Sequence, residues 1–258
     1  MTVPPKQAEM RINVEDGTRT AAVVLAAGSG KRMGSSTKKQ YMLLFDKPVV
    51  YYSLKAFQES FIDEIILVVS AGDVEYCKEE IVKRYGFHKV SHIVEGGRER
   101  YHSVAAGLAK ATECDYIFIH DGARPVLTHN MLDRLLAGVK KDGACVAGMP
   151  VKDTIKLSDE NDYIEATPDR RLVWTIQTPQ VFEYRLVRGA YEELIRQERE
   201  HPGGQMAVTD DAMVVEGFTD HKVKLVEGSY ENIKITTPED IAVAELFLKN
   251  AGQYGCIF

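Results

Sequence analysis

Five short segments of the chain are almost wholly apolar and rich in β-branched residues, and each is followed by a longer segment with helical periodicity. They span residues 21–25, 65–69, 92–94, 116–119 and 144–149. A strand with one face in water alternates apolar and polar residues, whereas a strand covered on both faces of a parallel sheet is apolar throughout. The pattern therefore predicts an α/β fold with a doubly wound, mostly parallel, Rossmann-like sheet.

The segments between these strands predict helices at residues 74–84, 103–111 and 131–140. A further helix is predicted to begin at Thr237, because Thr is a favoured N-cap, Pro238 suits the first helical position, and acids follow in the first turn. We expect a single domain from residue 21 to residue 250, preceded by a flexible leader of residues 1–20.

Residues 151–177 interrupt this alternation. Two short strand-like stretches, around residues 154–157 and 163–167, flank a polar turn at residues 158–162, which predicts a protruding β-hairpin arm. A two-stranded hairpin is marginally stable alone, so the arm must pack on its own domain or on a second subunit.

The charge and cysteine content restrict the partners and the compartment. A net charge of -6 argues against nucleic acid or a membrane surface as a partner, since both require a surplus of Lys and Arg. No apolar run approaches the ~20 residues of a membrane span. Cys77, Cys114, Cys145 and Cys256 form no C-x-x-C pair, and Cys114 and Cys145 lie in or beside apolar runs. Free thiols of this kind indicate a reducing cytoplasm.

A glycine-rich turn follows the first predicted strand, with the sequence Ala26-Ala27-Gly28-Ser29-Gly30-Lys31-Arg32-Met33-Gly34. Glycine permits close backbone approach, so the amides of such a turn can bind a phosphate. The turn is not a P-loop, because Arg32 rather than Ser or Thr follows Lys31. It is also a poor dinucleotide-binding turn, because Met33 occupies the third glycine position.

Five cations lie between Lys31 and Lys47 of this acidic chain. We interpret Lys31, Lys38 and Lys47 as solvated surface charges. Arg32 and Lys39 flank the glycine-rich turn, where a triphosphate would require positive charge.

With Lys39-Gln40-Tyr41, the glycine-rich turn resembles the signature of the cytidylyltransferases that make 4-diphosphocytidyl-2-C-methyl-D-erythritol. Further segments resemble that family in order: Glu95-Gly96-Gly97-Arg98-Glu99-Arg100 with Ser103-Val104, His120-Asp121-Gly122-Ala123-Arg124-Pro125, Val151-Lys152-Asp153-Thr154, Asp169-Arg170, Thr178-Pro179-Gln180, Thr209-Asp210-Asp211-Ala212 and Glu231-Asn232-Ile233-Lys234. Lys38 and Arg98 depart from the family pattern, which usually has Pro and often Asp there.

The resemblance implies that the predicted sheet is that of a nucleotidyltransferase fold. It implies CTP and 2-C-methyl-D-erythritol 4-phosphate as substrates, and a homodimer joined through the arm. It implies that Asp121 holds Mg²⁺, as an isolated carboxylate does together with phosphate oxygens. It assigns catalysis to Arg32, Lys39 and Lys234. The residues that it places around CTP are Ala26, Ala27, Gly28, Gly97, Ser103 and Gly122. The residues that it assigns to the acceptor are Arg124, Thr154, Arg170, Thr209 and Lys234.

This reaction requires no general base, because the attacking phosphate is largely a dianion at neutral pH. None of the seven His has a triad-like setting. His120, beside Asp121, is the one candidate, and we favour a packed residue at a strand end.

Three alternatives stay open on the sequence. Ribitol 5-phosphate cytidylyltransferase shares the glycine-rich turn and the Asn-Ile-Lys segment, although residues 169–174 and 209–212 resemble the methylerythritol enzyme more closely. A nicotinamide-dependent oxidoreductase is disfavoured by Met33 and by Leu54-Lys55, where a ribose-binding acid is expected. A catalytically inactive nucleotide-binding regulator is disfavoured because the cations and the carboxylate that the chemistry requires are present.

Overall fold

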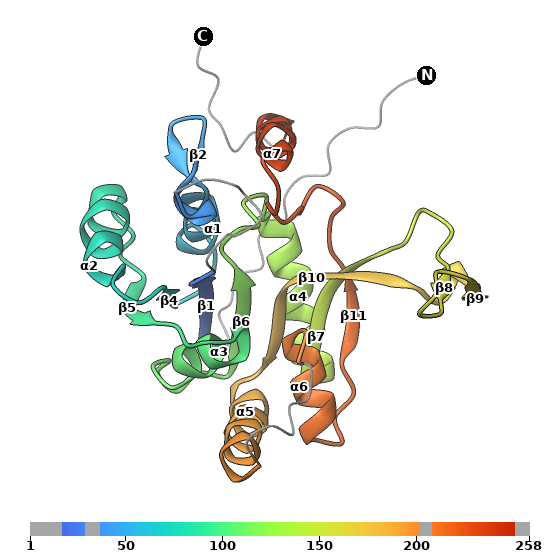
Figure 1. Cartoon of the computed structure of the whole chain (residues 1–258). Helices are drawn as coiled ribbons and strands as arrows, with labels where there is room; N and C mark the ends of the chain where they lie inside the picture. Colours follow the sequence, from blue (N-terminus) through green and yellow to red (C-terminus); the bar gives the residue numbers. More distant parts are fainter. Residues whose placement is uncertain (1–16, 29–36, 202–207, 251–258) are drawn as a thin grey trace.

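A seven-stranded sheet occupies the centre of the computed structural model, which describes residues 17–28, 37–201 and 208–250 (Figure 1). In spatial order the strands are β11 (Lys224–Glu227), β7 (Ala144–Pro150), β10 (Trp174–Glu183), β6 (Tyr116–Asp121), β1 (Thr20–Ala26), β4 (Glu64–Val69) and β5 (Val90–Glu95). Only β10 runs antiparallel to its neighbours within this sheet. The prediction of a doubly wound, mostly parallel sheet is confirmed, and β10 and β11 were not predicted.

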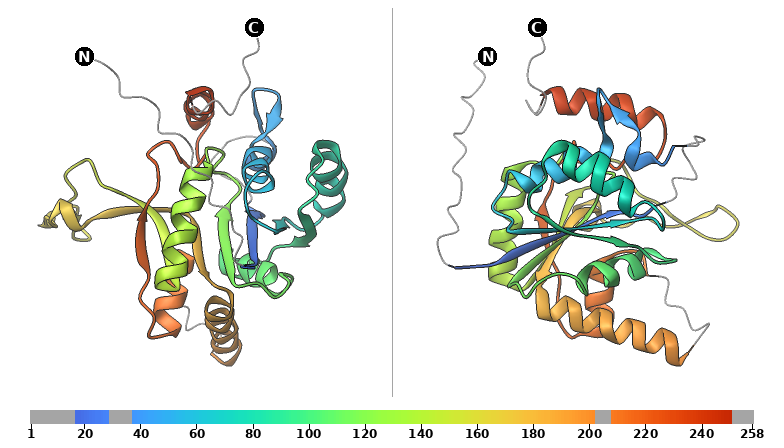
Figure 2. Two further views of the ribbon diagram at one scale, coloured as in Figure 1. Left: turned by 180° about the vertical axis from the view of Figure 1, so that it is seen from behind. Right: turned by 90° about the vertical axis from the view of Figure 1, so that its left-hand side faces the viewer.

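Helices cover both faces of the sheet, as the right-hand view of Figure 2 shows for α1 and α2 on one side and α3 and α5 on the other. The first face packs against α1 (Val49–Gln58), α2 (Val74–Tyr76) with η3 (Cys77–Lys83), and α4 (His129–Asp142). The second face packs against α3 (Arg100–Leu108), α5 (Tyr184–Glu200) and α6 (Asp211–Phe218).

Successive residues of a strand supply opposite faces. In β1, Ala22 and Val24 belong to the first core and Ala21 and Val23 to the second, and all four are fully buried. Burying a Val side chain stabilises the fold by roughly 1.5–3 kcal/mol. The strand that ends at the glycine-rich turn is therefore held rigidly from both sides.

A third, smaller core joins α7 (Glu239–Asn250) to the short ribbon of β2 (Leu43–Leu44) and β3 (Lys47–Pro48). Leu44 and Leu248 are fully buried there. The helix α7 begins two residues after the predicted N-cap Thr237. The carboxylate of Asp240 accepts hydrogen bonds from the amides of Thr236 and Thr237, at 2.7 and 2.9 Å.

Two predicted helices differ in detail. The helix α3 begins at Arg100, three residues earlier than predicted, because Glu99 and His102 form a reciprocal capping box. The segment predicted as one helix over residues 74–84 is an α-helical turn followed by the π-helix η3. By contrast, α4 contains the whole predicted segment and begins at the N-cap Thr128, whose hydroxyl accepts from the Met131 amide at 3.3 Å.

The predicted arm is a hairpin that projects from the sheet, and its strands are β8 (Leu157–Ser158) and β9 (Ile164–Ala166) (Figure 1). Tyr163 is 74% exposed and Leu172 is 81% exposed, so apolar side chains of the arm find little cover within one subunit. The predicted end of the arm at residue 177 is too late, because Trp174 already belongs to β10 and pairs with β7.

The predicted leader of residues 1–20 lies outside the described residues up to residue 16, and its last residue, Thr20, belongs to β1. Over the three described stretches of the chain, no helix is long and apolar enough to cross a membrane.

Candidate active site

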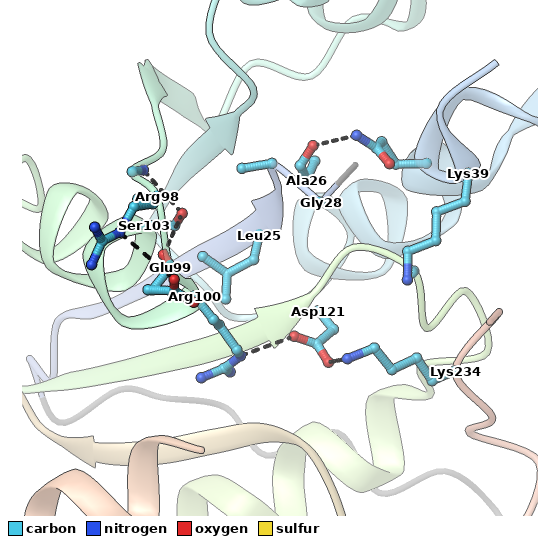
Figure 3. Close-up of a pocket in the computed structure, with 14 residues that line it drawn as sticks. Leu25, Ala26, Gly28, Lys39, Arg98, Glu99, Arg100, Ser103, Asp121 and Lys234 are labelled. Carbon is cyan, nitrogen blue, oxygen red and sulfur yellow. Dashed lines mark hydrogen bonds and ion pairs between the residues drawn. The ribbon is translucent and has the colours of Figure 1, made fainter. Parts of the chain in front are cut away.

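A cavity of about 380 Å³ opens at the carboxyl ends of β1 and β6, where parallel α/β sheets place their ligands (Figure 3). Its lining includes eight of the residues singled out in the sequence: Ala26, Ala27, Gly28, Lys39, Gly97, Ser103, Asp121 and Lys234. Residues from five separate parts of the chain therefore meet in one site.

The start of the glycine-rich turn is held by side chains from two other elements. Gln40, on the short helix η2 (Lys39–Tyr41), donates from Nε2 to the Ala26 carbonyl at 2.6 Å. Ser70, which follows β4, donates to the Ala27 carbonyl at 3.1 Å. The rest of the turn, including Arg32, lies outside the described residues.

Lys39 extends from η2 toward Asp121 and Lys234 (Figure 3). Its ammonium donates to the Ile235 carbonyl at 3.3 Å, so it lies against the segment that carries Lys234. Lys38 instead forms a 2.6 Å ion pair with Asp73, away from the cavity lining.

Asp121 ends β6 and is 8% exposed. Its carboxylate lies 2.7 Å from Nζ of Lys234, 3.5 Å from Nε of Arg100 and 4.0 Å from Nε of Arg124. Burial by itself would raise the pKa of this carboxyl, but the charges of Arg100 and Lys234 outweigh burial and hold the pKa well below its usual range. Asp121 is thus a carboxylate surrounded by cations.

Arg100 links Asp121 to a second buried carboxylate. Its Nη1 and Nη2 each lie 2.7 Å from an oxygen of Asp211, which is fully buried and also accepts from the Tyr191 hydroxyl at 2.6 Å. Such bidentate pairing satisfies both charges without water. Asp211 in turn donates its backbone amide to Gln180 of β10 at 3.0 Å, which fixes the start of α6.

The turn between β5 and α3 forms the opposite wall of the cavity. The Gly97 amide donates to Oγ of Ser103 at 3.2 Å. A Cβ on Gly97 would overlap the His102 side chain, and one on Gly96 would lie 2.5 Å from Ser103 Oγ and 2.7 Å from Ala27 Cβ. Only glycine fits this tight approach of the two loops. Arg98, which departs from the family pattern, is largely exposed at the rim.

Gly122 and Arg124 lie just behind the cavity, in the turn after β6. The Gly122 amide donates to the Leu25 carbonyl at 2.9 Å, which ties this turn to β1. Nη1 of Arg124 donates to the Asn232 carbonyl at 2.7 Å, whereas its buried Nε has no hydrogen-bond acceptor within the described parts of the chain.

Besides Arg124, three further predicted acceptor residues do not line the cavity. Thr209 is exposed just before α6, and its hydroxyl lies 3.7 Å from Sδ of Met213. Thr154 and Arg170 are exposed at the base of the arm, where Nη1 of Arg170 donates to the Lys152 carbonyl at 3.0 Å. One subunit therefore does not bring the arm residues to Asp121.

Residues 20–250 match the family model of 2-C-methyl-D-erythritol 4-phosphate cytidylyltransferase. The chain belongs to this family. It is 52% identical over 231 residues to the 2-C-methyl-D-erythritol 4-phosphate cytidylyltransferase of Lachnoclostridium phytofermentans, with 90% of this chain and 97% of that protein covered. It is 48% identical over 238 residues to the 2-C-methyl-D-erythritol 4-phosphate cytidylyltransferase of Alkaliphilus oremlandii, with 92% and 98% covered.

The crystal structure of 4-diphosphocytidyl-2C-methyl-D-erythritol synthase from Anaerococcus prevotii has the same fold, with a TM-score of 0.77 at 33% identity and coverage of 91% of this chain and 97% of that one. The family resemblance and the assignment as a nucleotidyltransferase are therefore confirmed. A member of the cytidylyltransferase family is an enzyme, so the inactive regulator and the oxidoreductase lose their support.

Gln40 and the Arg100–Asp211 pair were not predicted as site residues of this cytidylyltransferase family member. Gln40 belongs to the Lys39-Gln40-Tyr41 segment of the family signature, but its partner Ala26 is fourteen positions away. Arg100 and Asp211 are separated by 111 positions. No periodicity or spacing in the sequence indicates such a pairing.

Proposed function

We propose that this enzyme transfers the cytidylyl group of CTP to 2-C-methyl-D-erythritol 4-phosphate and releases pyrophosphate. The observation that carries the proposal is the cavity in which Lys39, Lys234 and the Asp121 carboxylate face the turn of Gly97 and Ser103. Cations and a carboxylate suit the triphosphate, and a tight turn with backbone and hydroxyl groups suits a pyrimidine edge. The names of the relatives support the choice of acceptor.

In this scheme an oxygen of the acceptor phosphate attacks the α-phosphorus of CTP in line. The bond from the α-phosphorus to the oxygen that bridges the α- and β-phosphates breaks, and this oxygen leaves as a terminal oxygen of pyrophosphate. Lys39 and Arg32 stabilise the negative charge that develops on the transferred phosphoryl group. Ala26, Ala27 and Gly28 approach the nucleotide through their backbone, and Gly122 supports the wall behind it.

No protein base is needed, and the setting of His120 agrees with that. His120 is fully buried, its Nδ1 lies 3.1 Å from the Thr178 hydroxyl, and its Nε2 lies 3.1 Å from the Arg124 carbonyl. Burial lowers the pKa of His120 to about 4. Both ring nitrogens are engaged by the protein, so the imidazole orients the turn after β6 rather than taking a proton from substrate.

Asp121 is the residue that would hold Mg²⁺. No group of three or more His, Cys, Asp or Glu side chains suitable for a metal occurs among the described residues. A single carboxylate, that of Asp121, suits a Mg²⁺ ion that keeps several waters and is otherwise bound by substrate phosphates. When bound, the ion would neutralise charge on the triphosphate, while Lys234 and Arg100 hold the carboxylate in the cavity.

We further propose a homodimer in which the arm reaches the partner subunit, so that Thr154 and Arg170 of one subunit complete the acceptor site of the other. Two observations support this arrangement: apolar side chains of the arm are exposed, and neither Thr154 nor Arg170 lines the cavity of its own subunit. The subunit that contains the cavity would itself contribute three residues to acceptor binding: Arg124, Thr209 and Lys234. We assign residues 21–250 to one domain, and the buried free thiols of Cys77 and Cys145 support a reducing cytoplasm.

A coupled assay of pyrophosphate release tests the substrates directly. We expect turnover with CTP, Mg²⁺ and 2-C-methyl-D-erythritol 4-phosphate, and at least ~10²-fold lower kcat/KM with ribitol 5-phosphate or with ATP, because a buried polar site rejects a poorly matched substrate by such factors. Preference for ribitol 5-phosphate would replace the acceptor named here. The absence of pyrophosphate release with every polyol phosphate would refute the proposal.

A further inference from the structure

Gln40 is a buried amide to which neither the family resemblance nor the proposed mechanism assigns a role. It is 2% exposed, and it lies on η2 directly after Lys39. Its Nε2 donates to the Ala26 carbonyl at 2.6 Å, and this bond is the dashed line at Ala26 in Figure 3. Its Oε1 has no hydrogen-bond partner within the described residues, although the side chain lines the cavity. The bond to Ala26 is thus the hydrogen bond that the Gln40 side chain makes within the described residues.

The bond to Ala26 fixes the direction of the next amide. A trans peptide is planar, and its C=O and N–H point to opposite sides. Because Gln40 holds the Ala26 carbonyl on the η2 side, the Ala27 N–H of the same peptide faces away from η2. Ser70 engages the Ala27 carbonyl in the same manner and so directs the Gly28 N–H. Ala27 and Gly28 both line the cavity.

Gln40 also links the glycine-rich turn, which approaches the nucleotide, to the helix that carries Lys39. Its neighbour Lys39 approaches the glycine-rich turn closely, since a Cβ on Gly28 would lie 4.0 Å from Cε of Lys39. The hydrogen bond therefore sets the distance between the turn that approaches the nucleotide and the lysine that faces the phosphates.

We propose that Gln40 is a positioning residue for the nucleotide: it aims the Ala27 amide into the CTP site and holds the Lys39 helix in register with that turn. The inference rests on CTP being the nucleotide, as proposed above. It predicts a defect in CTP binding rather than in acceptor binding or in global stability.

The test compares Gln40→Met, which keeps the volume but cannot donate, with Tyr41→Phe as the matched control. Tyr41 lies on the same short helix, and its hydroxyl is 3.0 Å from Oδ2 of Asp73 rather than near Ala26. For Gln40→Met we expect Kd and KM for CTP to rise about 10-fold, the loss equivalent to one buried hydrogen bond, with KM for the acceptor unchanged. Tyr41→Phe should leave both KM values unchanged, and Ser70→Ala should raise KM for CTP by a smaller factor.

CTP affinity of Gln40→Glu, measured over a series of pH values, distinguishes a positioning role from a purely structural one. The ionised carboxylate faces the Ala26 carbonyl without a proton, whereas the protonated form donates as the amide does. We expect the ratio of CTP affinity of Gln40→Glu to that of the unchanged enzyme to rise as the pH falls from 8 to 5.5. This variant and Ser70→Ala keep the test decisive if Gln40→Met does not fold.

Two failures are distinguishable. If the unchanged enzyme does not bind CTP, the proposed function fails. If it binds CTP and Gln40→Met binds CTP equally well, or if acceptor KM and CTP KM rise together, Gln40 does not position the nucleotide.

Discussion

Lys38 and Lys39 are neighbours in the sequence, but their ammonium groups have different surroundings. Lys38 is paired with Asp73 at 2.6 Å, and Lys39 faces the cavity beside the segment of Lys234. We expect Lys39→Ala to lower kcat by ~10² to 10³, as deletion of one preorganised donor to a developing anion does. Lys38→Ala should lower kcat less than about threefold, since its ion pair with Asp73 lies away from the cavity. Steady-state kinetics with CTP check this, and equal losses in both variants would mean that the lysines act only through general electrostatics.

Asp121 lies among three cations, and its proposed role in binding Mg²⁺ depends on its negative charge. Asp121→Asn keeps the shape, and Arg100 retains its bidentate partner Asp211, so the fold should persist. We expect turnover to fall at least ~10²-fold and not to recover when Mg²⁺ is raised. A magnesium titration of initial rates measures this, with circular dichroism to confirm folding. Full activity of the variant in excess Mg²⁺ would remove Asp121 from the mechanism.

Glu64 connects two strands and a loop: it lies in β4 and its carboxylate binds β5 and the loop before β6. Its Oε1 accepts from the Ser91 hydroxyl at 2.5 Å, and its Oε2 accepts from the amide of Thr112 at 3.1 Å and from the Thr112 hydroxyl. Burial would raise the pKa of Glu64, but these hydrogen bonds outweigh burial and lower it. Since the folded pKa lies below the unfolded one, the unfolded state takes up protons first. The ionised Glu64 side chain therefore makes its full contribution to the free energy of unfolding above about pH 4.5. This contribution is lost as the pH falls through the pKa that Glu64 has in the folded protein.

Replacing this carboxylate should remove that pH dependence. We expect Glu64→Gln to lower the free energy of unfolding by about 1–3 kcal/mol at pH 7, because the charged acceptor of three hydrogen bonds is lost. The difference from the unchanged protein should shrink as the pH falls below about 4.5. Urea unfolding at a series of pH values measures both quantities. Glu160→Gln, an exposed glutamate of the arm, is the control and should show neither effect. A pH-independent difference would mean that Glu64 contributes only through packing.

At the scale of the whole molecule, the site described for one subunit lacks the arm residues Thr154 and Arg170. A closed two-fold contact would bring them to the partner's cavity. Mixing two inactive variants, Lys39→Ala and Arg170→Ala, tests this arrangement, because a hybrid dimer then carries one site with both lesions and one site with neither. After co-refolding an equal mixture, random pairing predicts recovery of roughly a quarter of wild-type activity.

The opposite outcome is equally clear. If Arg170 serves its own subunit, each hybrid site carries one lesion and no activity returns. Each variant refolded alone is the control for spontaneous recovery. A monomer by light scattering at working concentration would exclude the shared site without the mixing experiment.

The sequence alone predicts the strands that bury both faces, because residues 21–25, 65–69 and 144–149 are apolar throughout, as strands covered on both faces are. It also indicated which polar groups would gather, because Asp121 and the glycine-rich turn follow directly after such strands. These features are local, and a local pattern is visible in one dimension. The short strand β11 lacks a comparable apolar run: three of its four residues are exposed, which is why it was missed.

The pairing of groups that are distant in the sequence became visible in the three-dimensional structure alone. The antiparallel insertion of β10 between β6 and β7, the Arg100–Asp211 pair, and the bond from Gln40 to Ala26 all depend on how the chain returns through space. The arm is a further example. The sequence of residues 151–177 predicted its hairpin but not its end, because Trp174 to Gln177 belong to β10. Apolar periodicity encodes which face of an element is buried, whereas a charge or an amide finds its partner through the packing of whole elements, which no single segment of sequence contains.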